Sequence, residues 1–334
     1  MSDRLGRRKL LAVVGYGLAA LTKPVFPLAG SLGWLVAARF IDRVGKGIRG
    51  APRDALVADV TPPALRGAAF GLRQTLDTVG AFVGPLLAIG LMALTANHFH
   101  AVFWVAVLPA FVAVGVLLLF VDEPRPSAGA ATAGGRRFSR AALARLGASL
   151  WAVVAVGVVF NLARFSEAFL ILRAADAGLS ARWAPLVLVL MSVAFSLSAY
   201  PAGALSDRVS RVAVLAVGMA LLLAADVALA LLPGLTGVVL GVLLWGLHMG
   251  FTQGVLGALV ADSAPAELRG TAFGVFNLCG GMALLAASVL AGGLWDAWGY
   301  RGTFLSGAAL AFAALLGLAL LRRQDRGPVP PTVG

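Results

Sequence analysis

Cysteine, histidine and charged residues are scarce in this sequence. Cys279 is the single cysteine among 334 residues, and there are only three histidines. One cysteine excludes a disulfide within the chain and a cysteine-based metal site, and we expect neither a metal nor another cofactor. Charged residues make up 13% of the chain and hydrophobic residues 60%, which is too apolar for a water-soluble domain. We therefore expect a lipid bilayer to be the solvent.

Acidic residues are scarcer than basic ones, with 15 Asp and Glu against 27 Lys and Arg and a net charge of +12. The basic residues gather at 4–9, 125–145, 208–211 and 322–326, whereas the connections near Gly30, Asn97 and Pro233 carry none. This alternation follows the positive-inside rule. It predicts a multi-pass protein of the plasma membrane, the inner membrane in a bacterium, with a cytoplasmic C-terminus. We expect a monomer without a nucleic-acid partner.

Long apolar runs predict a series of membrane-spanning helices. About 20 helical residues cross the roughly 30 Å of hydrocarbon in a bilayer. We expect ten spans, at 9–29, 31–59, 67–95, 101–121, 149–173, 183–205, 212–232, 235–262, 270–295 and 302–321. Residues 122–148, rich in Pro, Gly, Ala and Arg, are expected to form a cytoplasmic linker. This divides the chain into an N-terminal half at 1–121, a C-terminal half at 149–322 and a cytoplasmic tail at 323–334.

The two halves contain an internal repeat. Residues 56–71 match residues 259–274 at an offset of 203, with 11 of 16 positions identical, and residues 2–4 match 206–208 at an offset of 204. The repeats run in the same direction, but the second copy has two spans before 206–208 that the first copy lacks. We therefore expect an all-α membrane protein of two parallel six-helix repeats, the first shortened to four helices. An upstream extension of about 57 codons is expected to encode the missing pair.

A short basic motif occurs once in each repeat. The first copy comprises Asp3, Arg4, Gly6, Arg7 and Arg8, and the second comprises Gly203, Asp207, Arg208 and Arg211, with Ser210 where a glycine is expected. With two parallel six-helix halves and a basic central loop, this motif resembles the major facilitator superfamily. The resemblance implies a cytoplasmic gate in which the acid lies against the start of the eleventh helix, near Arg269 and Gly270. The alternative is a tight basic turn that only sets topology.

Glycines in the span from residue 67 resemble a second motif of that family. Gly71, Gly80 and the pair Gly84 and Pro85 are similar to the fifth-helix motif of twelve-helix drug/proton antiporters, although Ala88 and Ile89 replace two expected glycines. The resemblance implies export. Small residues such as Gly80 and Gly84 also clear a helix face for close packing, which is the alternative explanation.

Residues 39–54 carry so many charges that hydropathy alone predicts a loop. Their repeat counterpart, 242–257, is apolar, so we predict a membrane helix in both places. On a helix, seven charged side chains fall within an arc of about 140°: Arg39, Asp42, Arg43, Lys46, Arg49, Arg53 and Asp54. Each charge facing lipid costs about 2.5–3.5 kcal/mol at the bilayer centre. The stripe is therefore predicted to line a substrate cavity.

Other spans contribute polar residues to the predicted cavity. They are Arg73, Asn161, Arg164, His248 and Gln253. Asp77 and Glu167, each near an arginine, are predicted to carry a coupled proton. The alternative is that the pairs Arg73 and Asp77 and Arg164 and Glu167 are static ties between helices. We place Asp226 near a membrane interface and Lys23 at the outer surface.

These features together predict a secondary active transporter that exports a small organic solute by alternating access, coupled to protons. Arg39, Arg43, Lys46, Arg49, Arg53 and Arg73 outnumber Asp42, Asp54 and Asp77 by three, which favours an anionic substrate. The alternatives are a non-transporting receptor or scaffold with a transporter fold and an inactive truncated fragment. The His-Glu-x-x-His, Gly-x-Ser-x-Gly and Walker motifs do not occur in the chain, so we do not expect an enzyme.

Overall fold

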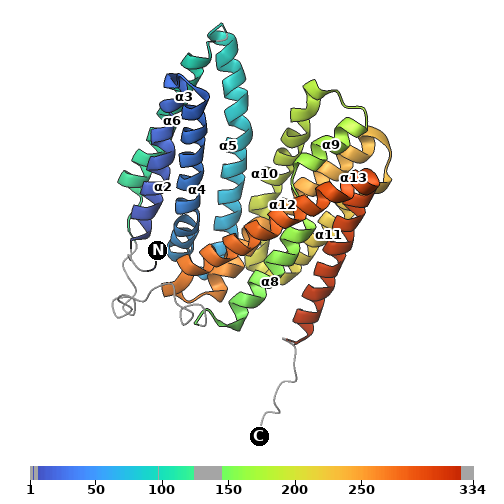
Figure 1. Cartoon of the computed structure of the whole chain (residues 1–334). Helices are drawn as coiled ribbons and strands as arrows, with labels where there is room; N and C mark the ends of the chain where they lie inside the picture. Colours follow the sequence, from blue (N-terminus) through green and yellow to red (C-terminus); the bar gives the residue numbers. More distant parts are fainter. Residues whose placement is uncertain (1–2, 4–6, 97, 124–144, 325–334) are drawn as a thin grey trace. The chain divides into compact units, whose positions relative to one another are not determined.

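The computed structural model describes residues 3, 7–96, 98–123 and 145–324, and these ranges contain helices but no strand (Figure 1). Inter-residue contacts divide the chain into two units. The first comprises Met1–Pro63, Gly80–Gly147 and Ala261–Val275, and the second comprises Ala64–Val79, Ala148–Val260 and Phe276–Gly334. Each unit thus combines segments from both sequence repeats.

The first unit is built around three long helices. Its elements are α2 (Arg8–Thr22), α3 (Val25–Leu28), α4 (Leu32–Val60), the second part of α5 (Arg66–Leu94) and α6 (Phe99–Phe120). α2 packs against both α4 and α6. It crosses α4 at two glycines, because a Cβ at Gly15 would lie 2.7 Å from the carbonyl oxygen of Gly45, and a Cβ at Gly45 equally close to that of Gly15. Small residues at a crossing allow two backbones to approach closely.

α4 is one continuous helix from Leu32 to Val60. It includes the charged stretch 39–54, so the helix predicted from the apolar repeat counterpart is confirmed. Pro52 lies inside α4, where it removes one backbone hydrogen bond.

α6 has an apolar surface that the rest of the described chain leaves uncovered. None of its residues is buried, and Phe99, Leu108, Leu119 and Phe120 are each more than half exposed. An exposed helix without a polar face suits lipid rather than water.

The second unit contains α8 (Gly147–Ala163), α9 (Ala168–Asp176), α10 (Ala184–Arg208), α11 (Arg211–Leu231), α12 (Gly234–Ser263) and α13 (Arg269–Gln324). The span predicted at 149–173 corresponds to the apolar segment Gly147–Asp176, which is long enough to cross a membrane, but residues 164–166 interrupt its helix between α8 and α9. α13 combines the two spans predicted at 270–295 and 302–321, with Gly299 in a left-handed conformation between them (φ 66°).

Aromatic rings fill the centre of the second unit. Phe165, in the interruption between α8 and α9, lies against Phe169, Trp245 and Phe304, with ring centroids 5.3–5.4 Å apart. Trp245 and Phe304 have no exposed surface. These rings pack α9, α12 and α13 around the interrupted backbone.

By length and composition, eight helical segments of the described chain are able to cross a membrane. α4 is not among them, since its charges lower its hydropathy, and the segment Ala266–Leu318 contains both arms of α13. The chain is therefore a multi-pass helical membrane protein. The count of ten spans stays a prediction.

Candidate functional site

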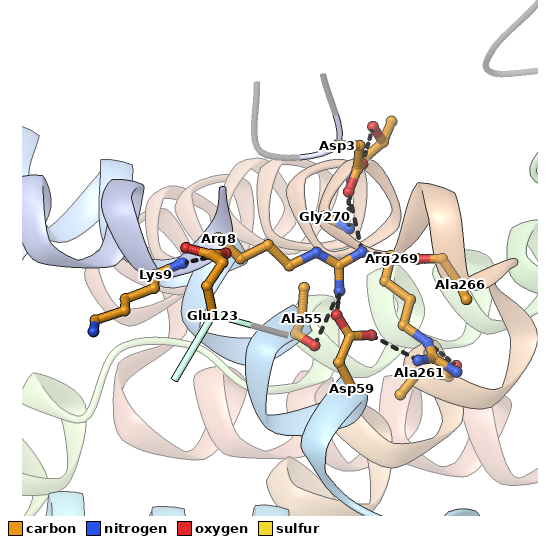
Figure 2. A network of polar contacts seen from close by, with 11 residues as sticks. Asp3, Arg8, Lys9, Ala55, Asp59, Glu123, Ala261, Ala266, Arg269 and Gly270 are labelled. Atoms are coloured by element: carbon orange, nitrogen blue, oxygen red, sulfur yellow. Dashed lines mark hydrogen bonds and ion pairs between the residues drawn. The ribbon is translucent and has the colours of Figure 1, made fainter. Parts of the chain in front are cut away.

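A carboxylate caps the start of α13 in the first unit (Figure 2). Asp3 accepts hydrogen bonds from the backbone N–H groups of Gly270 (3.0 Å) and Thr271 (2.6 Å), and from the Thr271 hydroxyl (2.7 Å). The first N–H groups of a helix have no partner within the helix, and the helix dipole makes this end positive. Asp3 therefore accepts hydrogen bonds from the free N–H groups at the start of α13, although it lies more than 260 residues away in sequence.

Arg8, at the start of α2, connects this cap to α4. Its guanidinium group donates to the carbonyl oxygens of Ala55 (3.2 Å) and Ala266 (2.7 Å) and lies 3.5 Å from the carboxylate of Asp3. It also forms an ion pair with Asp59. One planar group with five N–H donors can serve all four partners, whereas the ammonium group of lysine has three.

Asp59 lies between two arginines. Besides Arg8 it pairs with Arg269, whose Nη1 lies 2.7 Å from Asp59 Oδ1. Arg269 also donates through Nε to the carbonyl oxygen of Ala261 at 3.3 Å. Asp3, Arg8, Asp59 and Arg269 thus form a chain of alternating charge with side chains 8–17% exposed. Alternation compensates each partly desolvated charge.

The second unit contains a corresponding arrangement. Asp207, near the end of α10, accepts hydrogen bonds from the backbone N–H groups of Gly67 and Ala68, both at 2.8 Å. Arg211 lies 3.2 Å from Asp207 and donates to the carbonyl oxygen of Ala258 at 3.2 Å. Asp207 therefore caps the start of α5 as Asp3 caps that of α13. In each case the acid comes from one sequence repeat and the capped helix from the other.

A glycine contact allows this second cap to form. A Cβ on Gly203 would collide with the carbonyl oxygen of Gly67, and a Cβ on Gly67 would collide with Gly203. Gly71 lies against the same segment, since its Cβ would collide with the carbonyl oxygen of Ala199. Gly203 of the basic motif and Gly71 of the fifth-helix motif thus allow α10 and α5 to come into backbone contact.

The remaining motif residues either lie apart from these caps or fall outside the described residues. Arg7 and Arg208 are exposed and belong to none of the described ion pairs, and Arg4 and Gly6 are outside the described residues. The sequence motif did not include Asp59 or Thr271. Asp59 had a signal, since Asp59 and Asp262 are identical positions of the repeat.

Gly80 and Gly84 make no close helix contact. A Cβ at either position would meet no atom of the described chain within 4 Å. The packing expected at these two glycines is thus not found in the described residues, and close approach occurs at Gly71 instead. Pro85 lies inside α5 and is exposed.

The charged stripe of α4 divides into paired and unpaired members. Asp42 pairs with Lys23 at 3.3 Å and Arg53 with Asp54 at 3.0 Å. The guanidinium of Arg49 stacks 4.0 Å from the ring centroid of Tyr16. The exposed members Arg39, Arg43 and Lys46 belong to none of the ion pairs among the described residues.

Polar residues of α5 and α12 meet in the second unit. Arg73 Nη1 lies 2.9 Å from Asp77 Oδ2, and Arg73 also donates to the side chain of Gln74. Gln74 in turn donates to Gln253 of α12. The side chain of Asp77 is 56% exposed, so this acid combines an arginine partner with access to its surroundings.

The polar residues predicted near α8 do not form one hydrogen-bonded cluster. Asn161 donates to the carbonyl oxygen of Gly157 within α8 (2.7 Å). Arg164 and Glu167 lie in the interruption between α8 and α9, and no ion pair joins them among the described residues. His248 is fully buried on α12, with Nδ1 3.1 Å from the carbonyl oxygen of Gly218.

Comparison with known proteins agrees with this architecture. The family profile described as Major Facilitator Superfamily matches residues 1–287 and 168–333. An uncharacterized MFS-type transporter of Methanocaldococcus jannaschii is 30% identical over 328 residues, which covers 96% of this chain and 79% of that protein.

Two solved structures share the fold. The human organic anion transporter MFSD10 superposes with a TM-score of 0.72 at 18% identity and covers 95% of this chain and 78% of its own. A fucose:proton symporter of E. coli superposes with a TM-score of 0.71 at 19% identity, over 94% of this chain and 84% of its own. At these identities the likeness concerns the fold alone.

Proposed function

We propose, from the premise that this chain belongs to the major facilitator superfamily of membrane transporters, that it exports a small organic solute in exchange for protons. The observation that carries this proposal is the matched pair of carboxylate caps, Asp3 at α13 and Asp207 at α5. We assign both caps to a cytoplasmic gate that opens and closes during alternating access. The basic residues beside each cap support the cytoplasmic side.

The strength of such a cap suits a reversible latch. A hydrogen bond to a charged group contributes about 1.5–3 kcal/mol net, and a charge at a helix terminus about 0.3–2 kcal/mol. Moving a two-state equilibrium from 1:99 to 99:1 takes about 5.5 kcal/mol. A cap made of two or three such bonds therefore holds one state firmly, yet the binding of a solute and a proton is sufficient to release it.

The direction and the coupling ion are supported by residues of α5. Gly71, Gly80, Gly84 and Pro85 resemble an antiporter motif, which favours export. Asp77 is a proton-coupling candidate because it combines an arginine partner with an exposed carboxylate. Protonation of Asp77 would release Arg73 and so link a proton to a local rearrangement. Glu167, in the interruption between α8 and α9, is the second candidate.

The charge of the solute is supported by α4. Arg39, Arg43 and Lys46 follow one another on one helix face and are exposed, and no described carboxylate pairs with them. Cations at membrane depth are costly unless an anion approaches them. We therefore propose that the solute carries a carboxylate or phosphate group. The other residues of the proposed cavity are Asp42, Arg49, Arg53, Asp54, Arg73, Asn161, Arg164, His248 and Gln253.

The proposal is tested with the chain reconstituted in liposomes. Fluorescein serves as an anionic probe and ethidium as a cationic one, and efflux is followed with and without a pH gradient. Asp3→Asn and Asp207→Asn keep the shape of each side chain but replace one acceptor oxygen with an NH₂ group, which cannot accept from a backbone N–H. We expect each substitution to abolish efflux. Asp122→Asn, at an exposed acid, is the matched control and should behave as the wild type.

Other outcomes separate the competing functions. A wild-type chain that binds a probe but never moves it would indicate a receptor or scaffold. Wild-type efflux in both cap variants would show that the caps are not a gate. Efflux that ignores the pH gradient would remove protons from the proposal while leaving the gate in place.

A further inference from the structure

A carboxyl group is buried in the second unit without a hydrogen-bond partner. Asp226, near the end of α11, has 0% of its surface exposed. Neither carboxyl oxygen accepts a hydrogen bond from any residue that the structure describes. An ionised carboxylate is far costlier than a neutral acid in such surroundings, because no dipole or cation replaces its lost hydration. The protonated acid is therefore the form that fits this place.

No charged or titratable group on the described helices around Asp226 is placed to balance the negative charge of an ionised carboxylate. None forms an ion pair or hydrogen bond with Asp226 among the described residues: Arg164 and Glu167 between α8 and α9, Arg173 on α9, Tyr200 on α10, His248 on α12, and Asp296, Tyr300 and Arg301 on α13. Arg173 instead donates to the carbonyl oxygens of Leu229 (2.9 Å) and Leu232 (3.1 Å). A neutral Asp226 needs no countercharge.

The carboxyl group points toward α13, where a glycine leaves room for it. A Cβ at Gly307 would lie 2.7 Å from Oδ2 of Asp226 and 2.9 Å from Cε1 of Phe165. Both distances are shorter than real Cβ contacts, so a larger residue would displace the acid or the ring. Asp226 and Phe165 thus pack closely against Gly307, and Asp226 has a fixed place in the interior.

Two further buried polar atoms, both on the neighbouring helix α12, have no hydrogen-bond partner among the described residues. They are Nε1 of Trp245 and Nε2 of His248. The two rings lie 6.2 Å apart, and Phe165 lies 5.4 Å from Trp245. Phe165, whose ring packs against Trp245, and the Asp226 carboxyl group both lie against Gly307. Buried polar groups without partners are rare in native proteins, and ionisable ones within membrane spans commonly belong to proton or ion pathways.

We propose that Asp226 is a proton-binding residue of the transport cycle. It holds a proton in the arrangement described here and loses it when the contact between α11 and α13 loosens. The carboxyl O–H bond then breaks, the proton passes to water, and the carboxylate remains. This inference rests on the proposed proton-coupled export. It differs from the assignment of Asp77, which is exposed and paired with Arg73.

The protonation state is tested by infrared spectroscopy of the purified chain. A protonated carboxyl group has a C=O stretch that shifts on exchange into D₂O, and the difference between wild type and Asp226→Asn isolates this group. We expect the band to be lost in Asp226→Asn and kept in Asp296→Asn, where the acid is exposed. Gly307→Ala, which keeps the acid but removes its space, should shift the band. An unchanged band in Asp226→Asn, or in Gly307→Ala, would overturn the inference.

The role in coupling is tested in liposomes with the fluorescein and ethidium probes. Asparagine imitates the neutral acid, so Asp226→Asn should keep the thermal stability of the wild type and still bind probe. We expect it to lose efflux driven by a pH gradient, whereas Asp296→Asn keeps it. Gradient-driven efflux that survives Asp226→Asn would overturn this inference alone. Efflux that ignores the gradient in the wild type would instead overturn the proposed proton coupling, and the infrared result would still report on Asp226.

Discussion

Asp59 and Arg269 form an ion pair, with Oδ1 and Nη1 2.7 Å apart, although 210 positions separate them in the sequence. The pair joins the end of α4 to the start of α13 in the first unit. Since Asp59 also pairs with Arg8, a single carboxylate holds two arginines from α2 and α13. Asp59 therefore ties three helices of this unit, α2, α4 and α13, to one another.

Asp59→Asn should destabilise the protein. It leaves two partly buried arginines without their carboxylate. Breaking a fully buried pair costs about 3–5 kcal/mol, and the 11–17% exposure of these side chains lowers the expected cost to about 1–3 kcal/mol. Thermal unfolding in detergent should show a lower Tm. The control is Asp122→Asn, at an exposed acid, which should unfold near the wild-type temperature.

A double-mutant cycle separates this pair from general damage. Asp59→Asn and Arg269→Gln together should cost less than the sum of the two single changes, because the second change removes a charge that the first has left unpaired. Strict additivity would mean that the 2.7 Å contact contributes nothing to stability.

Gly203→Ala and Gly80→Ala should have opposite effects on stability. A methyl group at Gly203 would collide with the backbone of Gly67, and overpacking costs about 1–3 kcal/mol. A methyl group at Gly80 meets no described atom within 4 Å, and alanine is favoured over glycine in a helix by about 0.8–1 kcal/mol. Unfolding temperatures of the two variants compare them directly. Equal destabilisation would contradict the assigned backbone contact.

The Gly80→Ala variant also tests whether Gly80 has a role in transport apart from helix packing. If the resemblance of Gly80 to the antiporter motif reflects function, Gly80→Ala should lose efflux while keeping its stability. Wild-type efflux in this variant would leave Gly80 without a role in transport.

The sequence predicted some of these features and not others, for physical reasons. The helix at 39–54 was predictable because its repeat counterpart is apolar and helical. The interruption at 164–166 was not, since the break contains neither glycine nor proline, and the polar residues Asn161, Arg164 and Glu167 were assigned to a cavity or to proton coupling instead. The prediction placed Asp226 near an interface because it lies late in its span. Its burial against Gly307, a residue distant in sequence, could not be inferred from that position. Position within a span does not determine what covers a side chain.

Arg173→Lys should destabilise the end of α11. Arg173 is 2% exposed, bonds the carbonyl oxygens of Leu229 and Leu232, and stacks 4.0 Å from the ring centroid of Tyr300. Lysine keeps the charge but lacks the planar fork that makes these contacts together. Loss of one such hydrogen bond costs about 1–3 kcal/mol, measured as a lower Tm. Arg182→Lys, an exposed arginine 5.2 Å from the Trp183 ring, is the control and should change little.

Neutralising the exposed cations of α4 should change which charge the protein exports. Arg39, Arg43 and Lys46 are exposed, and none is held by a described carboxylate, so their removal breaks no ion pair and leaves the fold intact. The triple change to glutamine keeps the length and polarity of the side chains. We expect fluorescein efflux to fall at least about tenfold, the equivalent of about 1.4 kcal/mol, with ethidium efflux unchanged or increased.

The control for this selectivity test is Lys23→Gln, which removes a cation already paired with Asp42. This substitution also removes a positive charge, but the charge is one that an ion pair already holds. The ratio of fluorescein to ethidium efflux should therefore stay near that of the wild type. A wild type that prefers ethidium, and still prefers it after the triple change, would show that these cations do not select the solute. An equal fall for both probes would point to a general loss of transport, and the anionic solute would then have no support from α4.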